Sequence, residues 1–416
     1  MRLPEKAVEK VDARPCGLAP AQGEGHRAAR IDGVGTQHMI RLLHTADWQI
    51  GKPFGGFDEE RRVELRSARF AAVGRIAALA RDRAVDAVLV AGDAFDDNTV
   101  AERDVNRVLD EMAAYRGPWI FLPGNHDAAV TGSVWARLRG HLSRRGLANV
   151  VIADEPAAID LLDGRLAILP APLVRRHEGA DLTGWFDHAE TPPGAVRVGL
   201  AHGALENRLP EAADAANPIA ETRTTTARLD YLALGDWHGF LAEVAPKTVY
   251  AGTPEPDRYP SNEPGHVALV EIDGPGDQPR IERVPVALYR WTARSERLDG
   301  DAGGLEATFS TFDDPGKTLL KLTLAGSLSL RERVRLEETI AHWRDRFFSL
   351  DIRDDDLFDE PDEDDLDKID LSGFVRTAIE ALRAKAADPA DPEREAARLA
   401  IRMAYVEHRR LSGTEG

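Results

Sequence analysis

The sequence predicts an α/β fold in which mixed sheets are flanked by helices. Five short, mostly apolar runs are typical of strands covered on both faces, at residues 40–43, 87–91, 119–122, 196–200 and 231–234. Apolar residues at helical spacing between the first two runs, and the segment 99–115 after the second, predict helices. Strands that alternate with helices favour a mainly parallel or mixed sheet wrapped by helices.

A polar cluster follows each predicted strand at once. The clusters are His44-Thr45-Ala46-Asp47-Trp48-Gln49, Gly92-Asp93-Ala94-Phe95-Asp96, Gly124-Asn125-His126-Asp127, Ala201-His202-Gly203 and Gly235-Asp236-Trp237-His238. Side chains that follow strand ends meet in a crevice at one edge of an α/β sheet, so we expect these groups to converge. Oxygen and imidazole groups gathered in this way are what a two-metal phosphoesterase requires.

The residue types in these clusters suit phosphoryl transfer. Two divalent ions about 3.5–4 Å apart can clamp the phosphoryl oxygens of an in-line displacement. The carboxylate of Asp93 would bridge the ions, and His126 could stabilise developing charge or protonate the leaving oxygen. A single cluster of this kind more often reflects a structural residue, but all five in this order favour a shared metal site.

At these motifs the chain resembles the calcineurin-like metallophosphoesterase superfamily and, within it, the SbcD/Mre-type DNA repair nucleases. The resemblance covers about residues 39–275, and Tyr250–Glu255 is similar to the segment that closes the catalytic domain in these nucleases. It implies a four-layer metallophosphoesterase sandwich, with mixed sheets flanked by helices, over residues 39–285. It also implies two bound divalent metal ions.

The resemblance implies roles for individual residues. Two sets would hold the ions: Asp47, Asp93 and His238 for one, and Asp93, Asn125 and His202 for the other. His126 and Asp127 would be catalytic, and Asp96 would support the ligands from outside the inner coordination sphere.

Two positions depart from the family's pattern, and we keep both as candidate ligands. Gln49 ends the first motif where the family has a metal-binding histidine, and Asp236 stands where the family has the histidine of a Gly-His pair. Amide and carboxylate oxygens make the site richer in oxygen and one charge more negative, which favours Mn²⁺ or Mg²⁺ over Zn²⁺. We expect Mn²⁺ in the first place. The alternative is an eroded site in a protein that kept only its fold.

Composition sets outer bounds on the chain. Its 416 residues are enough for two or three domains, and the single Cys16 excludes an internal disulfide. No apolar run is long enough for a signal peptide or a membrane span, so we expect a protein of the reducing cytoplasm with no membrane partner. Residues 1–38 lack periodicity and are expected to be a disordered extension, unless the true start is Met39.

The net charge of −18 is unusual for a DNA-binding protein, but much of it is local. Residues 351–370 hold twelve carboxylates against Arg353 and Lys368, a net charge of −10, which leaves −8 for the rest of the chain. Basic residues near the motifs could line a path for DNA phosphates: Arg61, Arg62, Arg175 and Arg176. Each of these could equally lie on a solvated face in an ordinary ion pair.

Beyond about residue 285 the periodicity changes. Residues 286–352 are expected to form a small α/β capping domain, with strands at 318–324 and 349–352 and a helix that begins with the capping box of Ser329 and Glu332. An acidic linker is expected at 353–370.

Two amphipathic helices are expected at 371–416. The first carries an apolar stripe of Leu371, Phe374, Val375, Ala378, Ile379 and Leu382; the second starts at Asp391-Pro392 and carries Ala396, Leu399, Ala400 and Met403. Both helices could pack on the capping domain. By the family resemblance, they could instead dock on the coiled coil of an SbcC-like SMC-type ATPase.

The sequence therefore predicts a metal-dependent DNA nuclease subunit that works with an ATPase in DNA repair, as a 3′–5′ exonuclease with some endonuclease activity. Two other functions stay open: a phosphodiesterase or phosphatase for a small nucleotide, and a catalytically eroded scaffold subunit. The sequence also leaves open whether the chain forms a homodimer.

Overall fold

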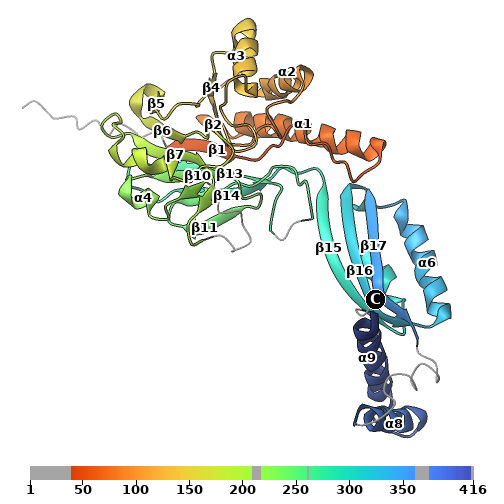
Figure 1. The fold of residues 1–416 in the computed structure, drawn as a ribbon. Helices are drawn as coiled ribbons and strands as arrows, with labels where there is room; N and C mark the ends of the chain where they lie inside the picture. Colours follow the sequence, from red (N-terminus) through yellow and green to blue (C-terminus); the bar gives the residue numbers. More distant parts are fainter. Residues whose placement is uncertain (1–38, 209–216, 260–261, 361–373, 414–416) are drawn as a thin grey trace, which may run out of the picture. The chain divides into compact units, whose positions relative to one another are not determined.

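The computed structural model describes residues 39–208, 217–259, 262–360 and 374–413 (Figure 1). The predicted extension at 1–38, residue Leu371 of the first apolar stripe and residues 361–370 of the predicted linker lie outside the described residues.

One six-stranded sheet carries the first three polar clusters. Its strand order is β14 (Arg280–Pro285), β13 (His266–Ile272), β1 (Ile40–Thr45), β2 (Ala87–Ala91), β3 (Trp119–Leu122) and β4 (Val150–Ile152). β1 to β4 are parallel, and β13 and β14 are antiparallel to their neighbours. The parallel strands end at one edge of the sheet, where the clusters begin.

A second six-stranded sheet carries the other two clusters. Its order is β11 (Leu241–Ala245), β12 (Thr248–Tyr250), β10 (Tyr231–Gly235), β7 (Val196–His202), β6 (Leu166–Ala171) and β5 (Ile159–Leu161). β6, β7, β10 and β12 are parallel, and β5 and β11 are antiparallel. All five predicted strands are confirmed, but they are divided between two sheets. A short parallel pair, β8 (Ala204–Leu205) and β9 (Pro218–Ile219), follows β7.

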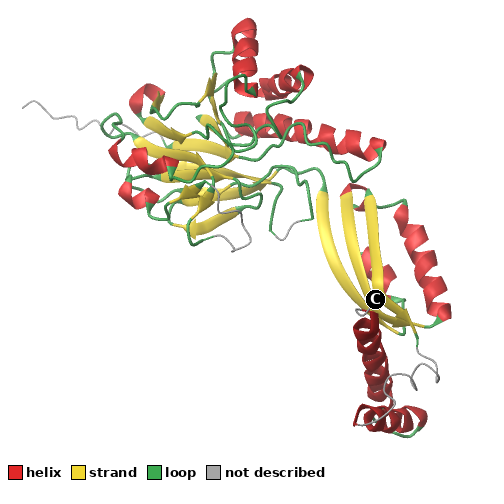
Figure 2. Ribbon diagram, viewed as in Figure 1, coloured by secondary structure: helices red, strands yellow, loops and turns green. Residues whose placement is uncertain are grey.

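The two sheets pack face to face, with helical layers outside them (Figure 2). Successive side chains of a strand point to opposite faces, so Leu42 enters the core between the sheets while Leu43 enters the core under the helices. The helical elements of this region are α1 (Glu59–Asp82), α2 (Glu102–Glu111), η1 (Met112–Ala114), α3 (Val134–Arg145), η2 (Leu162–Gly164), η3 (Leu182–His188) and α4 (Arg223–Thr226). The predicted four-layer α/β sandwich is confirmed.

α1 shows why these helices form where they do. The Asp58 side chain accepts a hydrogen bond from the backbone N–H of Arg61, and Glu59 and Glu60 place negative charge in the first turn. Both features stabilise a helix N-terminus, by satisfying a free donor and by opposing the helix dipole. Apolar residues at helical spacing, such as Phe70 and Val73, then anchor α1 in the outer core.

A separate three-stranded parallel sheet follows, with its own apolar core. Its elements are β15 (Arg290–Asp299), α5 (Gly304–Phe309), η4 (Pro315–Lys317), β16 (Thr318–Leu328), α6 (Leu330–Arg344) and β17 (Ser349–Asp359). Only half of the expected capping box forms: Ser329 accepts from the N–H of Glu332, while the Glu332 carboxylate accepts from the N–H of Ala302. β17 runs to Asp359, so residues 353–359 of the expected linker are strand, because their backbone pairs with β16.

A helical hairpin of α8 (Phe374–Ala387) and α9 (Arg394–Gly413) ends the described chain. The predicted stripe on the second helix is not the face that packs on the sheet. Leu399 and Met403 are exposed, and the buried face is one residue further along, at Ile401, Tyr405 and Val406. Apolar residues spaced four apart occur at two adjacent sets of positions in α9, so the sequence allows either helix face to be buried. Packing of α9 against β16 and β17 selects one of the two faces. None of the helices that the structure describes is long and apolar enough to cross a membrane.

Candidate active site

The five clusters meet where the parallel strands of both sheets end. Gly235 of β10 pairs with His202 of β7, and the His202 Nδ1 lies 2.9 Å from the Ala91 carbonyl oxygen of β2 in the other sheet. Asp47 and Asp93 lie two residues beyond the ends of β1 and β2. The site is therefore built across the space between two sheets.

The backbone at the site adopts conformations that most residues avoid. The φ angles are 53° at Asp47, 49° at Gln49, 53° at Asp93 and 95° at Asp236. Left-handed backbone is uncommon for residues other than glycine, and it tends to occur at functional sites because the fold must hold it there. Four candidate ligands share this property.

Two glycines allow the strand ends to approach one another. A Cβ atom at Gly92 would lie 2.1 Å from the His202 Nδ1, and one at Gly124 would lie 2.2 Å from the Asp93 Oδ1. Neither position can accept a side chain without displacing a candidate ligand. The glycines of the Gly-Asp and Gly-Asn-His-Asp motifs are thus explained by close approach.

Asp47, Asp93 and His202 form a buried group whose ligand atoms all lie within 4.8 Å of one another. The His202 Nε2 is 3.5 Å from the Asp93 Oδ1, and the His202 Nδ1 donates to the Ala91 carbonyl. A neutral His202 therefore presents the lone pair of Nε2 to the group, as a metal ligand must.

Asn125 adds a fourth candidate ligand. Its Oδ1 lies 3.1 Å from the His202 Nε2. Two ligand atoms about 2.1 Å from one ion, at a right angle, lie about 3 Å apart. The observed spacing therefore fits a pair of ligands to one cation.

The charges of the group also call for a cation. Burial raises the pKa of Asp47 to about 6, although His238 and His202 oppose the rise. Burial lowers the pKa of His202, but the charges of Asp93, Asp236 and Asp47 outweigh it and raise that pKa to about 9. Neighbouring buried carboxylates are costly unless positive charge compensates them, and a divalent ion supplies that charge.

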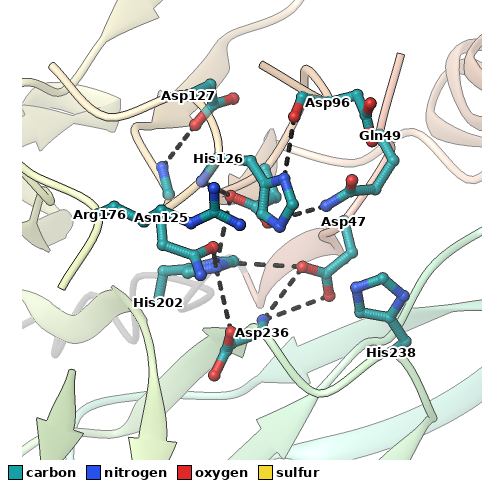
Figure 3. A network of polar contacts seen from close by, with 12 residues as sticks. Asp47, Gln49, Asp96, Asn125, His126, Asp127, Arg176, His202, Asp236 and His238 are labelled. Carbon is teal, nitrogen blue, oxygen red and sulfur yellow. Dashed lines mark hydrogen bonds and ion pairs between the residues drawn. The ribbon is translucent and has the colours of Figure 1, made fainter. Parts of the chain in front are cut away.

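The two departures from the family pattern lie in the same site (Figure 3). Gln49 donates its side-chain N–H to the Asp93 Oδ2 at 2.8 Å, and its Oε1 is buried with no hydrogen-bond partner among the described residues. The backbone N–H of Asp236 donates to the Asp47 Oδ1 at 3.1 Å, and the Asp236 Oδ1 lies 3.7 Å from the His202 Nε2. In this orientation the side-chain nitrogen of Gln49, and not its oxygen, bonds to the Asp93 carboxylate.

His126 lies at the open side of the group, with its side chain 31% exposed. Its backbone N–H donates to the Asp93 Oδ1, and its Nδ1 lies 2.9 Å from the Asp96 carbonyl oxygen. The Nε2 lies 4.0 Å from the Asp93 Oδ2. Asp96 therefore contacts His126 through the backbone carbonyl oxygen of Asp96.

Asp127 has a different place from the one predicted. Its buried carboxylate accepts hydrogen bonds from the backbone N–H groups of Gly124, at 2.7 Å, and Phe95, at 3.0 Å. Burial, together with the charge of Asp93, raises its pKa to about 8. These contacts join the loops that carry Asp93 and Asn125, so they support a positioning role for Asp127 in place of the predicted catalytic one.

His238 lies beside Asp47, among charged residues that the sequence analysis missed (Figure 3). The His238 Nδ1 is 3.0 Å from the Arg258 Nη2 and 3.6 Å from the Asp257 Oδ1. Lys52 reaches Asp257 at 2.6 Å. The signal available was the Asp257-Arg258 pair, which follows the domain-closing segment Tyr250–Glu255 after Pro256.

Only one of the four arginines predicted to contact DNA points toward this site. Arg61 is paired with Asp58 and donates to the Phe348 carbonyl, and Arg62 is paired with Glu59. Both belong to ion pairs one helical turn apart in sequence, so their prediction as a phosphate path is not supported. Arg175 pairs with Glu178 at 2.6 Å, whereas Arg176 projects toward the site (Figure 3).

A family model described as calcineurin-like phosphoesterase matches residues 40–240. These residues belong to that family. The phosphoesterase domain contains all five polar clusters, so the family and the site point to the same chemistry. Together with the buried group of Asp47, Asp93 and His202, the family indicates divalent metal binding.

Curated relatives of the phosphoesterase are nucleases and DNA repair proteins. The chain is 25% identical to the SbcD component of nuclease SbcCD from Bacillus subtilis (strain 168) over 341 residues, which cover 72% of this chain and 83% of that protein. It is 28% identical to the DNA double-strand break repair protein Mre11 of Aeropyrum pernix over 286 residues, 64% of this chain and 66% of that protein. It is 39% identical to the SbcD component of nuclease SbcCD from Rhodobacter capsulatus over 95 residues, 22% of each. The predicted family and enzyme class are confirmed for this domain: residues 40–240 are a calcineurin-like phosphoesterase domain, and the chain is related to nucleases.

Proposed function

We propose that this chain is the nuclease subunit of an SbcCD-like DNA repair complex, and that it hydrolyses DNA phosphodiester bonds with two divalent ions, Mn²⁺ in the first place and Mg²⁺ as the second choice. The observation that carries the proposal is the buried Asp93 carboxylate, which lies between candidate ligands from both sheets. We expect 3′–5′ exonuclease activity with some endonuclease activity.

In this proposal Asp93 would be shared by the two ions. Asp47 and His238 would complete one set of ligands, and Asn125 and His202 the other. When bound, the ions supply Lewis acidity to the phosphoryl group and acidify a water nucleophile. The Asp93 oxygens also accept from the His126 backbone and from Gln49, so the bridging carboxylate is held before any ion binds.

His126 is proposed to handle the leaving group. Its Nδ1 donates to the Asp96 carbonyl, which fixes the ring with Nε2 4.0 Å from the Asp93 Oδ2. A protonated His126 can then donate Nε2–H to the leaving oxygen while Asp96 still accepts from Nδ1. Arg176, which projects toward the same site, is proposed to bind a substrate phosphate.

The α8–α9 hairpin is proposed to bind an SbcC-like SMC-type ATPase. Phe374 is 87% exposed, and Val375, Leu399 and Met403 are also exposed, although all four are apolar. Exposed apolar side chains on a helical hairpin fit a helix-binding partner. The cytoplasmic location and a homodimer stay predictions.

The test of this function compares DNA with a small diester. Purified protein is incubated with 5′-labelled and 3′-labelled linear duplex DNA, and separately with a nucleotide diester, in Mn²⁺, Mg²⁺ or chelator. We expect metal-dependent shortening of DNA from the 3′ end. Turnover of the small diester alone would replace the nuclease with a small-nucleotide phosphodiesterase, the alternative that the net charge of −18 favours.

A scaffold subunit without catalysis is the second candidate, because Gln49 directs nitrogen, not oxygen, to the bridging carboxylate. The discriminating variant combines Gln49→His with Asp236→His. A working enzyme holds two ions before the change, and the variant moves its metal preference toward Zn²⁺ or Co²⁺, which tolerate nitrogen ligands. An eroded site gains both metal and hydrolysis only in the variant. Direct metal counting and activity against metal concentration separate the two.

A further inference from the structure

His238 lies between a cation and an anion that compete for the same ring nitrogen. Its Nδ1 is 3.0 Å from the Arg258 Nη2 and 3.6 Å from the Asp257 Oδ1. A guanidinium group can only donate hydrogen bonds, so Nδ1 accepts from Arg258 with its lone pair. In a neutral ring the proton is then on Nε2.

This arrangement and metal binding by His238 exclude each other. A ligating nitrogen must present its lone pair, and a neutral imidazole has only one nitrogen free of a proton. If Nε2 binds the ion, the proton moves to Nδ1, which can no longer accept from Arg258. If Nδ1 binds, Arg258 occupies the ligand position itself. Arg258 must leave His238 in either case.

Asp257 is placed to receive the proton of Nδ1. Its side chain is 1% exposed, and it is flanked by Lys52, at 2.6 Å, and by the buried Arg69, at 3.7 Å. Asp257 is therefore a fixed carboxylate acceptor, of the kind that orients metal-binding histidines.

We propose that Asp257 is a positioning residue that prepares His238 for metal binding by accepting a hydrogen bond from Nδ1, and that Arg258 opposes it by donating to the same nitrogen. Metal binding then frees the Arg258 guanidinium from His238 only: its side chain is 62% exposed, and its Nε also pairs with the Asp257 Oδ1 at 3.1 Å. The inference rests on the proposed role of His238 as a ligand. It assigns opposite effects on metal affinity to two adjacent residues.

The test is Mn²⁺ titration of the full chain by calorimetry, with metal counting. Arg258→Ala removes the competitor and is expected to tighten Mn²⁺ binding several-fold. Asp257→Asn removes the carboxylate acceptor and is expected to weaken binding by about 10–100-fold. Arg176→Ala is the matched control, because it removes another guanidinium at the same site that contacts no described imidazole through a hydrogen bond.

Each outcome decides a different part of the inference. Opposite shifts in the two variants, with a smaller change in Arg176→Ala, support it. Equal tightening in Arg258→Ala and Arg176→Ala overturns it, because charge alone then explains the gain. Failure of Arg258→Ala to tighten binding also overturns it, whether or not Asp257→Asn folds. His238→Ala is counted in parallel, and an undiminished metal count in this variant refutes the proposed ligand role instead.

Discussion

Single residues in this protein are held under electrostatic and conformational strain. Asp47 and Asp93 are buried carboxylates in left-handed backbone, and each contacts the other strand ends through hydrogen bonds or charge. Neighbouring buried carboxylates are unfavourable without a cation. The residue types alone therefore indicated oxygen ligands for a metal ion. Mutation of single residues should therefore separate their roles in metal binding and in hydrolysis.

Asp93 and His126 should differ in what their loss removes. Asp93→Ala is expected to abolish hydrolysis and metal occupancy together, because one carboxylate serves both ions. His126→Ala is expected to keep both metals and to lower kcat by about 10²–10⁴-fold, the usual contribution of a general acid. The measurement is kcat together with metal counting, with the exposed His188→Ala as a control. Loss of metal in His126→Ala would contradict these assignments.

His44 should make stability depend on pH. It is fully buried, and burial lowers its pKa from 6.5 to about 3, against a hydrogen bond with the Leu234 backbone that raises it. Between these values the unfolded chain binds more protons, so stability is complete above about pH 6.5 and falls as the pH is lowered. At pH 5 the loss from this group is about 2 kcal/mol.

The check on His44 is the free energy of unfolding of wild type and His44→Phe, measured in denaturant at pH 7 and pH 5. The variant leaves the Tyr231 hydroxyl without the partner that it has at 2.8 Å, so it is less stable at both pH values. The quantity compared is therefore the loss of unfolding free energy from pH 7 to pH 5 in each protein. An equal loss on acidification in both proteins would show that His44 does not carry the effect.

Among the elements, α9 serves two surfaces at once. Tyr405 and Ile401 are buried, and Arg402 on the same helix bonds to Glu360 and to the Asp299 carbonyl. The opposite face carries Met403, which is 47% exposed. A helix of this kind both stabilises its own sheet and leaves apolar area for a partner.

The two faces of the hairpin should respond differently to truncation. Ile401→Ala is expected to cost about 2–5 kcal/mol of unfolding free energy, as for other buried aliphatic side chains. Phe374→Asp and Met403→Asp are expected to leave stability within about 0.5 kcal/mol and to break co-purification with an SbcC-like ATPase. Thermal denaturation and pull-down assays are run on the same variants. Retained binding in both Asp variants would remove the hairpin from the interface.

For the whole molecule, metal binding should be a source of stability. An ion that binds only the folded chain adds about 2.7 kcal/mol at a concentration of 100 times its Kd. Mn²⁺ is therefore expected to raise Tm by several degrees and chelator to reverse the rise. Asp93→Asn removes one buried charge, so we expect a metal-free protein at least as stable as wild type whose Tm no longer responds to Mn²⁺. A full Mn²⁺ response in this variant would argue against Asp93 as the bridge.

Much of the fold and the site could be predicted because the information is local. Alternation of strand and helix patterns, and polar clusters after apolar strands, are visible within short windows of sequence. The division of the strands between two sheets was not visible, because all five have the same apolar character and differ only in their partners. The buried register of α9 was missed for a similar reason, since it depends on the sheet beneath the helix.

The sequence by itself determined the phosphoesterase type of this protein, because ligand residues must follow strand ends wherever those strands pair. The tertiary structure alone decided which charges are available. It pairs Arg61 and Arg62 within their own helix, turns Asp127 toward the backbone, and brings Asp257 and Arg258 to His238. The physical reason is distance: electrostatic interactions act over a few ångströms, and only folding establishes which groups, near or far along the chain, lie that close.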